Sequence, residues 1–122
     1  MKDGRSQEDY LEAILLVEQK RGSVRSVDVA EHMNFSKPSV SKAMGLLVQE
    51  GLIEFVEGKH IQLTREGRVL AEKVYEKHRF FTDLLKKAGL APQAASEQAC
   101  LLEHALSDEA FDALKTAFLS KM

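Results

Sequence analysis

Apolar residues first recur at helical spacing after Ser6. Ser6 precedes polar and acidic residues and is a predicted N-cap, and the apolar stripe that follows passes through Tyr10, Ile14 and Val17. Basic residues and then Gly22 close the segment, as is typical of a helix C-terminus. The pattern predicts one amphipathic helix between Ser6 and Gly22.

Two shorter helices are predicted next. Ser26 is the expected N-cap of a helix over residues 27–33, and Ser36 is the expected N-cap of a helix that carries Pro38 in its first turn and stops at Gly51. The positions expected to face the core are Val27, Val29, Ala30 and Met33 in the first of these helices, and Val40, Ala43, Met44 and Leu47 in the second.

The strand-like pattern of this sequence is confined to residues 52–56 and 60–64. The two runs are separated by residues 57–59, with Gly58 in the middle, and this spacing predicts a β-hairpin with a glycine turn.

Three further helices are predicted after the hairpin. The first is long and runs from Thr64 to near Gly89, the second starts near Pro92, and the third is capped by Ser107. Their apolar stripes contain Leu70, Val74, Phe81 and Leu85, then Leu101, Leu102 and Leu106, then Phe111, Leu114 and Phe118.

The predicted order is that of a mainly α protein, with an N-terminal winged helix-turn-helix that has one hairpin wing and an all-helical second part. We expect residues 1–68 to read DNA and residues 69–122 to form a helical dimerisation domain. The second part is near the lower size limit for burying its own core, so a homodimer that shares this core is expected. The residues expected at the dimer interface are Phe80, Leu84, Leu102, Leu106, Phe111, Leu114 and Phe118.

Composition narrows the class of protein. The chain has 122 residues, of which 44% are hydrophobic and 30% are charged. No apolar run approaches the roughly 20 residues that a membrane span needs, and the first residues lack a signal-peptide layout, so we expect a cytoplasmic protein without a membrane partner. A net charge of −2 disfavours indiscriminate nucleic-acid binding but is compatible with a site-specific binder. A single cysteine, Cys100, excludes an intrachain disulfide.

Positive charge is concentrated where DNA reading is expected. No acidic residue occurs between His32 and Gln49, while lysines and hydroxyls gather at the start of the predicted third helix. A helix N-terminus with these groups suits phosphates and base edges in a major groove. The alternative is a plain helix cap with solvated lysines. The candidate DNA-binding residues are Arg25, Ser36, Lys37, Pro38, Ser39, Ser41, Lys42, Lys59 and His60.

A second constellation has the chemistry of a metal site. Cys100, Glu103 and His104 stand at i, i+3 and i+4, so a helix would place thiolate, carboxylate and imidazole on one stripe. Asp9 and Glu12 share a face of the first helix in the same way. Carboxylates with imidazole suit divalent manganese, iron, cobalt or zinc, and a thiolate favours the softer ions. The alternatives are a favourable helix start for the acids and core filling for the cysteine.

The imidazole of His78 on the long helix is a further candidate ligand, with a histidine on an ordinary helix surface as the alternative. Spacing alone does not bring these groups together in space.

At this point the ordered motifs resemble the diphtheria toxin repressor and manganese transport regulator (DtxR/MntR) family of metal-dependent transcriptional regulators. The motifs that carry the resemblance are Glu8-Asp9-Tyr10-Leu11-Glu12, Val27-Asp28-Val29-Ala30, Ser36-Lys37-Pro38-Ser39-Val40-Ser41, Glu50-Gly51-Leu52-Ile53, Leu63-Thr64-Arg65-Glu66-Gly67, Lys77-His78-Arg79 and Ala99-Cys100-Leu101-Leu102-Glu103-His104-Ala105-Leu106-Ser107.

The resemblance implies a fold, a corepressor and a ligand set. It implies Mn²⁺ or Fe²⁺ as corepressor, with Co²⁺ and Zn²⁺ as surrogates, and an operator-binding homodimer without an organic substrate. The implied ligands are Asp9, Glu12, His78, Cys100, Glu103 and His104.

The implied ligand set combines two branches of that family. The acidic pair Asp9 and Glu12 is similar to the manganese-sensing branch, whereas Cys100 is similar to the iron-sensing branch. A second ligand set of the iron branch has a carboxylate and a histidine where this chain has Thr82 and Ser96. The chain also looks like the short architecture, which has no C-terminal SH3-like domain.

The function predicted from these features is a metal-dependent repressor that binds a palindromic operator. One rival is a metal-independent winged-helix regulator, gated by a small ligand or by oxidation of Cys100. The other is a small metalloenzyme, which the sequence disfavours because it has no nucleophile elbow, phosphate loop or HExxH helix. We therefore expect no enzymatic activity.

Overall fold

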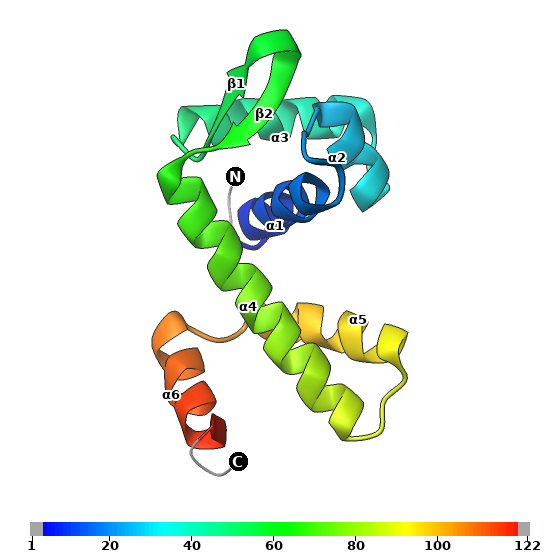
Figure 1. The fold of residues 1–122 in the computed structure, drawn as a ribbon, viewed down its shortest axis with the longest axis vertical. Helices are drawn as coiled ribbons and strands as arrows, with labels where there is room; N and C mark the ends of the chain where they lie inside the picture. Colours follow the sequence, from blue (N-terminus) through cyan, green and yellow to red (C-terminus); the bar gives the residue numbers. More distant parts are fainter. Residues whose placement is uncertain (1–3, 120–122) are drawn as a thin grey trace. The chain divides into compact units, whose positions relative to one another are not determined.

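A computed structural model describes residues 4–119, and their contacts divide the chain into two units, residues 1–73 and 74–122 (Figure 1). The elements are α1 (Gly4–Arg21), α2 (Ser26–Met33), α3 (Lys37–Gln49), β1 (Ile53–Val56), the short 3₁₀ turn Glu57–Lys59, β2 (His60–Leu63), α4 (Arg65–Lys87), α5 (Pro92–Glu103) and α6 (Asp108–Leu119). Over the described range, helices predominate and one antiparallel pair of strands is present, which confirms the expected fold class. Within residues 4–119, no helix is long and apolar enough to cross a membrane.

Helix α1 supplies much of the core of the first unit. Its apolar stripe is buried at Leu11, Ile14 and Leu15, as the helical spacing predicts. The helix ends after two basic residues at Gly22, which has a φ of +82°. The prediction of Ser6 as N-cap is wrong, because the helix already includes Gly4 and Ser6 lies in its first turn.

Helix α2 begins differently from the prediction. Its N-cap is Arg25 rather than Ser26, and the Arg25 amide N–H donates to the Asp28 carboxylate over 3.0 Å. Asp28 also pairs with Arg21 of α1 at 3.0 Å, so one acidic side chain both satisfies the helix start and ties it to α1. Val27, expected in the core, is instead 36% exposed, while Val29 is buried.

The start of α3 is as predicted. Ser36 is the N-cap, and its Oγ accepts a hydrogen bond from the Ser39 amide at 3.3 Å, with Pro38 in the first turn. The predicted core positions of this helix are buried: Val40, Ala43, Met44 and Leu47. The stripe faces inward, so the opposite side of α3 is left to solvent.

The predicted hairpin is confirmed. β1 and β2 pair antiparallel with Ile53 opposite Leu63 and Phe55 opposite Ile61. At the tip, Gly58 and Lys59 both have left-handed backbones, with φ of +67° and +66°. The open edge of β2 is covered locally, because the Ile61 amide donates to the carbonyl of Val24 at 2.8 Å.

The junction between hairpin and α4 is held by Thr64. Its hydroxyl donates to the Gly51 carbonyl at 2.7 Å and accepts from the Gly67 amide at 3.1 Å. A β-carbon at Gly67 would lie only 1.9 Å from the carbonyl oxygen of Leu52. The first turn of α4 therefore packs directly on backbone, and only glycine leaves room for it.

In the second unit, α5 and α6 lie on either side of the second half of α4 (Figure 1). A small core forms from Phe81, Ala99 and Phe111. The partly buried ring of Phe80 meets Phe81, Phe111 and Phe118 edge to face, with centroids 5.3–5.8 Å apart. Helix α6 begins as predicted, since the Ser107 hydroxyl accepts from the Ala110 amide at 3.0 Å.

The close approach at Gly67 leads to a stability prediction. Gly67→Ala should lower the free energy of unfolding by about 3 kcal/mol, because a methyl group there overlaps the Leu52 backbone. Gly45→Ala in α3 is the matched control: apart from its chain neighbours and the backbone of its own helix, nothing lies within 4 Å of its β-carbon position, and it should raise stability by about 0.5–1 kcal/mol. Urea denaturation followed by circular dichroism measures both. Wild-type stability of the Gly67 variant would contradict the packing described.

Candidate metal centre and nucleic-acid interface

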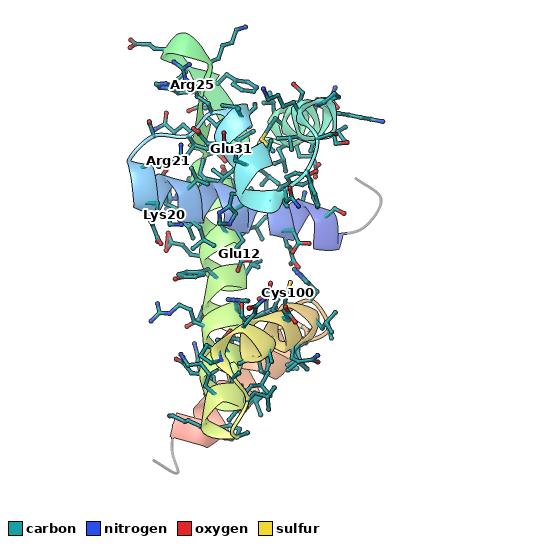
Figure 2. All side chains as sticks on the ribbon, turned by 90° about the vertical axis from the view of Figure 1, so that its right-hand side faces the viewer. Glu12, Lys20, Arg21, Arg25, Glu31 and Cys100 are labelled. Carbon is teal, nitrogen blue, oxygen red and sulfur yellow. The ribbon has the colours of Figure 1, made fainter. Side chains whose placement is uncertain are left out.

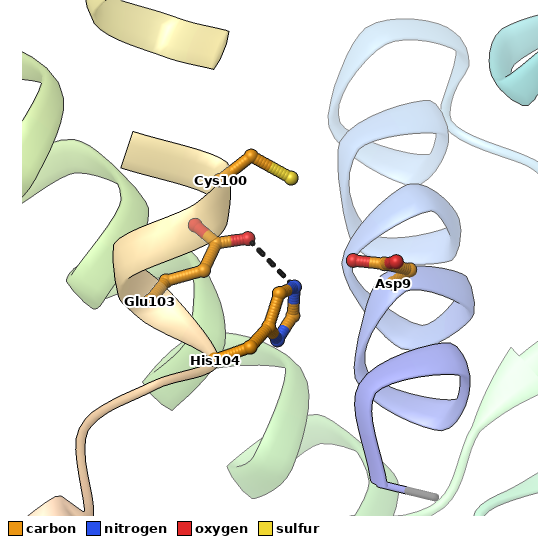
Figure 3. Close-up of side chains that lie close together, drawn as sticks. All are labelled: Asp9, Cys100, Glu103 and His104. Atoms are coloured by element: carbon orange, nitrogen blue, oxygen red, sulfur yellow. Dashed lines mark ion pairs between the residues drawn. The ribbon is translucent and has the colours of Figure 1, made fainter. Parts of the chain in front are cut away.

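Three candidate ligands meet at the end of α5. Cys100 and Glu103 lie on the helix, and His104 is its C-cap, with φ −92° and ψ −9°. His104 thus lies just beyond the last helical residue, but its backbone keeps a right-handed turn, so the predicted i, i+3, i+4 arrangement is retained. One ligand atom of each lies within 4.8 Å of the others, and Figure 3 shows the three side chains together.

The carboxylate of Glu103 is the centre of this group. Its side chain is fully buried. Its Oε2 lies 2.8 Å from Nδ1 of His78 on α4, and its Oε1 lies 3.3 Å from Nε2 of His104. The second contact lacks hydrogen-bond geometry, so Oε1 has no hydrogen-bond partner among the described residues. A buried carboxylate with an unsatisfied oxygen is costly unless a positive charge faces it.

The imidazole of His78 is oriented from two sides. Its Nδ1 faces Glu103, and its Nε2 lies 3.3 Å from the Ser96 hydroxyl. A hydroxyl on the second ring nitrogen is the kind of contact that fixes the orientation of a metal-binding histidine. Ser96 therefore contacts a candidate ligand. Thr82 is the other position at which this chain lacks a residue of the second ligand set of the iron branch. Its buried hydroxyl has no hydrogen-bond partner in the described part of the chain.

The donor set of the second unit fits a transition-metal ion. Its donors suit Mn²⁺, Fe²⁺, Co²⁺ or Zn²⁺ and fall into two groups that share Glu103: Cys100 and His104 belong to one group, and His78 belongs to the other. Asp9 and Glu12 lie three residues apart on α1 of the first unit, and both are half-buried. All the distances given above for this centre join residues of the second unit.

Most of the predicted DNA-binding residues of the first unit lie at the start of α3. Lys37, Pro38, Ser39 and Lys42 are exposed in the first two turns of α3. Ser36 and Ser39 are partly engaged with each other, since the Ser36 hydroxyl donates to Ser39 Oγ at 2.9 Å. The lysines and the exposed N-terminal turn of α3 are therefore the groups left to meet a nucleic acid.

A groove of about 500 Å³ lies between the start of α2, α3 and the hairpin tip. Two of the cations predicted to contact phosphate, Arg25 and Lys59, line it together (Arg25 is labelled in Figure 2). Gly58 lies close to this pair, because its β-carbon position is 3.8 Å from Nη2 of Arg25. His60, at the start of β2, does not line the groove. The full lining is Arg25, Ser26, Val27, Ser41, Phe55, Gly58 and Lys59.

Sequence reasoning missed Ser26, Val27 and Phe55 in this groove. Phe55 lies on the same strand face as the buried Ile53, yet it is 47% exposed. The signal that could have found it is its place near the end of β1, close to the hairpin turn.

The predicted dimerisation residues divide into two groups. Phe111 is buried in the core of the second unit, and Phe80, Leu84, Leu106 and Leu114 pack against that core. Phe118 and Leu102 are each 38% exposed, and Leu102 lies outside that cluster.

Comparison with known proteins decides the family. Residues 4–61 match the iron dependent repressor N-terminal DNA binding domain, and residues 64–120 match the iron dependent repressor metal binding and dimerisation domain. The chain belongs to the iron-dependent repressor family. Members of this family are transcriptional regulators and not enzymes, which confirms the resemblance to the DtxR/MntR regulators and the expectation that the protein has no enzymatic activity.

Individual relatives include an iron-dependent repressor and a metal-dependent regulator. The transcriptional regulator MntR of Escherichia coli O6:H1 is 34% identical over 108 residues, which cover 88% of this chain and 70% of that protein. The iron-dependent repressor IdeR of Mycobacterium bovis is 32% identical over 103 residues, covering 84% of this chain and 45% of IdeR. The solved metal-dependent transcriptional regulator MtsR has a TM-score of 0.82 and 29% identity, covering 95% of this chain and 54% of MtsR. The chain thus spans about half the length of this solved structure.

The donor set leads to a spectroscopic prediction. Addition of Co²⁺ to the reduced protein should produce a near-ultraviolet sulfur-to-cobalt charge-transfer band, because Cys100 is the single cysteine of the chain and lies with Glu103 and His104. Cys100→Ser should lose this band and bind Co²⁺ more weakly. An unchanged spectrum in the variant would remove the thiolate from the ligand set.

Proposed function

We propose that this chain is a metal-activated transcriptional repressor, acting in the cytoplasm, that binds a palindromic operator as a homodimer and controls metal-ion homeostasis. The observation that carries the proposal is the buried Glu103 carboxylate, which faces His78 and His104 and has an oxygen without a hydrogen bond to any residue from 4 to 119. A divalent cation is the partner that this arrangement of charges fits.

In the proposal, Asp9 and Glu12 of the first unit complete the ligand set formed by His78, Cys100, Glu103 and His104. The support is chemical, because each pair or triplet offers its donors on one helix face. Relatives of this chain also include a manganese-dependent repressor and an iron-dependent repressor. The corepressor is Mn²⁺ or Fe²⁺. The acidic pair favours manganese and the thiolate favours iron.

The proposed division of labour gives residues 1–68 the reading of DNA and residues 69–122 the binding of metal and the dimerisation. The N-terminal part of the chain matches a DNA binding domain, and the C-terminal part matches a metal binding and dimerisation domain. Ligands from both parts would couple metal binding to the spacing of two recognition helices. A dimer reads two half-sites only when these helices fit successive major grooves. A coupling of about 1–3 kcal/mol would tighten operator binding roughly 5- to 150-fold.

The DNA-reading surface in this proposal is the first part of α3. Ser39, Ser41 and Lys42 would face base edges and phosphates in the major groove, and the groove beside Arg25 and Lys59 would hold the flanking backbone. Two cations, two hydroxyls and exposed apolar side chains in one groove suit a sugar-phosphate strand. His60 would contact a phosphate next to the groove.

The exposed apolar residues of the second unit support the homodimer. Phe118 stacks edge to face on Phe80 but remains 38% exposed, as does Leu102. Large exposed side chains that extend a small core are typical of a shared interface.

The first prediction concerns metal-stimulated DNA binding. His104→Ala should reduce the stimulation of operator binding from roughly 5- to 150-fold to about one, because it removes an imidazole from the Glu103 group. Fluorescence anisotropy on a selected palindromic DNA, with Mn²⁺ and Fe²⁺ titrated separately and reversed by chelator, measures the effect. His32→Gln is the control, since His32 is a histidine outside both predicted sites and should leave the response intact. Tight binding that ignores metal and chelator would favour the metal-independent regulator.

The second prediction separates DNA reading from metal binding. Lys42→Ala should weaken operator binding and lower the slope of log affinity against log salt by about 0.9, the value for one lost phosphate contact. Its metal affinity should match that of the wild type. Lys20→Ala, on α1, is the control with an equal change in net charge and should keep the wild-type slope. Equal slopes for all three proteins would mean that Lys42 does not contact DNA.

A further inference from the structure

Lys77 is a buried charge that the proposed ligand set does not use. It lies on α4 directly before His78, and its side chain is only 6% exposed. Its Nζ donates to the Leu106 carbonyl at 3.1 Å and pairs with the Asp108 carboxylate at 2.8 Å. Lysine is rarely buried unless it is paired, and this ammonium is paired with both a carbonyl and a carboxylate.

The partners of Lys77 lie directly after the metal centre in sequence. α5 ends at Glu103 and α6 begins at Asp108, so residues 104–107 form the connection between them. Lys77 holds both the last part of this connection and the first residue of α6. The connection contains His104, a candidate ligand.

Two consecutive residues of α4 therefore bind the chain on both sides of His104 in the sequence. His78 contacts Glu103, the residue before His104, and Lys77 contacts Leu106, two residues after it. A cation at the carbonyls that follow a helix end is favourable both as a hydrogen-bond donor and toward the helix dipole. Loss of the ammonium would leave the Leu106 carbonyl without this donor and Asp108 without this cation.

We propose that Lys77 is a positioning residue of the metal centre, which fixes the 104–107 connection so that Glu103 and His104 keep their places beside His78. The inference rests on the proposed function in one respect, namely that this centre binds a divalent ion. Lys77 itself carries no ligand role, because its ammonium is a donor without a free lone pair.

The chain offers a matched control lysine. Lys115 on α6 also pairs with α4, through Glu76 at 2.9 Å, and a hydrogen bond to Glu76 raises the pKa of Lys115. Its side chain is 30% exposed, and it contacts no residue of the 104–107 connection in the pairs described. Removing either ammonium costs one ion pair between α4 and α6, and only Lys77 is tied to the metal centre.

The experiment compares Lys77→Met and Lys115→Met in the full chain. With the wild type, we expect Co²⁺ binding with the sulfur-to-cobalt band of Cys100. Lys77→Met should bind Co²⁺ at least tenfold more weakly and show an altered band at saturation, measured where circular dichroism shows the protein folded. Lys115→Met should stay within twofold of wild-type affinity with an unchanged band.

Hydrogen exchange provides a readout that needs no metal. In the metal-free protein, amides 104–108 should exchange at least tenfold faster in Lys77→Met than in Lys115→Met, because the connection has lost its anchor. A residue that served only global stability would speed exchange across the whole unit and leave the cobalt spectrum unchanged.

The outcomes are distinct. A folded Lys77→Met with wild-type Co²⁺ affinity and spectrum overturns the inference. If Lys77→Met does not fold, Asp108→Ala is the deciding variant, because the Asp108 side chain is 56% exposed. A Co²⁺ affinity at least threefold weaker in this variant supports the role of Lys77, whereas an affinity within twofold of the wild type overturns it. Absence of Co²⁺ binding by the wild-type protein would contradict the proposed function and, with normal local exchange in Lys77→Met, the inference as well.

Discussion

The burial of a single carboxylate, that of Glu103, is the constraint on which the second unit depends. An ionised carboxylate away from water needs positive or donor partners, and the unit arranges its helices to provide them. His78 from α4 and His104 at the end of α5 approach from different elements, and Lys77 secures the following turn. The apolar core of this unit is small: the cluster of Phe81, Ala99 and Phe111 is completed by partly buried side chains, and Val74 and Ala95 are buried as well. Polar contacts therefore share with apolar packing the task of holding three helices together.

The first unit solves a different problem with more ordinary means. Its core is apolar and continuous from α1 to the hairpin, and its polar contacts are used mainly at element ends: Asp28 at the start of α2, Ser36 at the start of α3 and Thr64 at the start of α4. Such caps fix where each helix begins without taking up the side chains on its outer surface. The exposed turns of α3 and the hairpin tip are thereby left available for a ligand.

Most of the fold could be predicted from the sequence, because apolar period and turn residues are local signals. The period found all six helices, and Gly58 marked the hairpin. Helix starts were predicted less well: the N-cap of α2 is Arg25 in place of Ser26, and the Asp28 carboxylate three residues along accepts from the Arg25 amide. The close group of Cys100, Glu103 and His104 follows from helical spacing, whereas the contact of Glu103 with His78 depends on how α4 and α5 pack. Lys77 gave no signal, because its partners lie 29 and 31 positions away and one of them is a backbone carbonyl.

The hairpin tip is built at some expense in conformational energy. Lys59 follows Gly58 and adopts a left-handed backbone with a φ of +66°, which costs a side-chain-bearing residue about 1–2 kcal/mol relative to glycine. A second glycine would make the turn easier to fold and would leave the groove beside Arg25 with one cation fewer. Lys59 therefore lowers the local stability of the tip and adds a positive charge to the groove, and the requirements of folding alone do not explain this choice of residue.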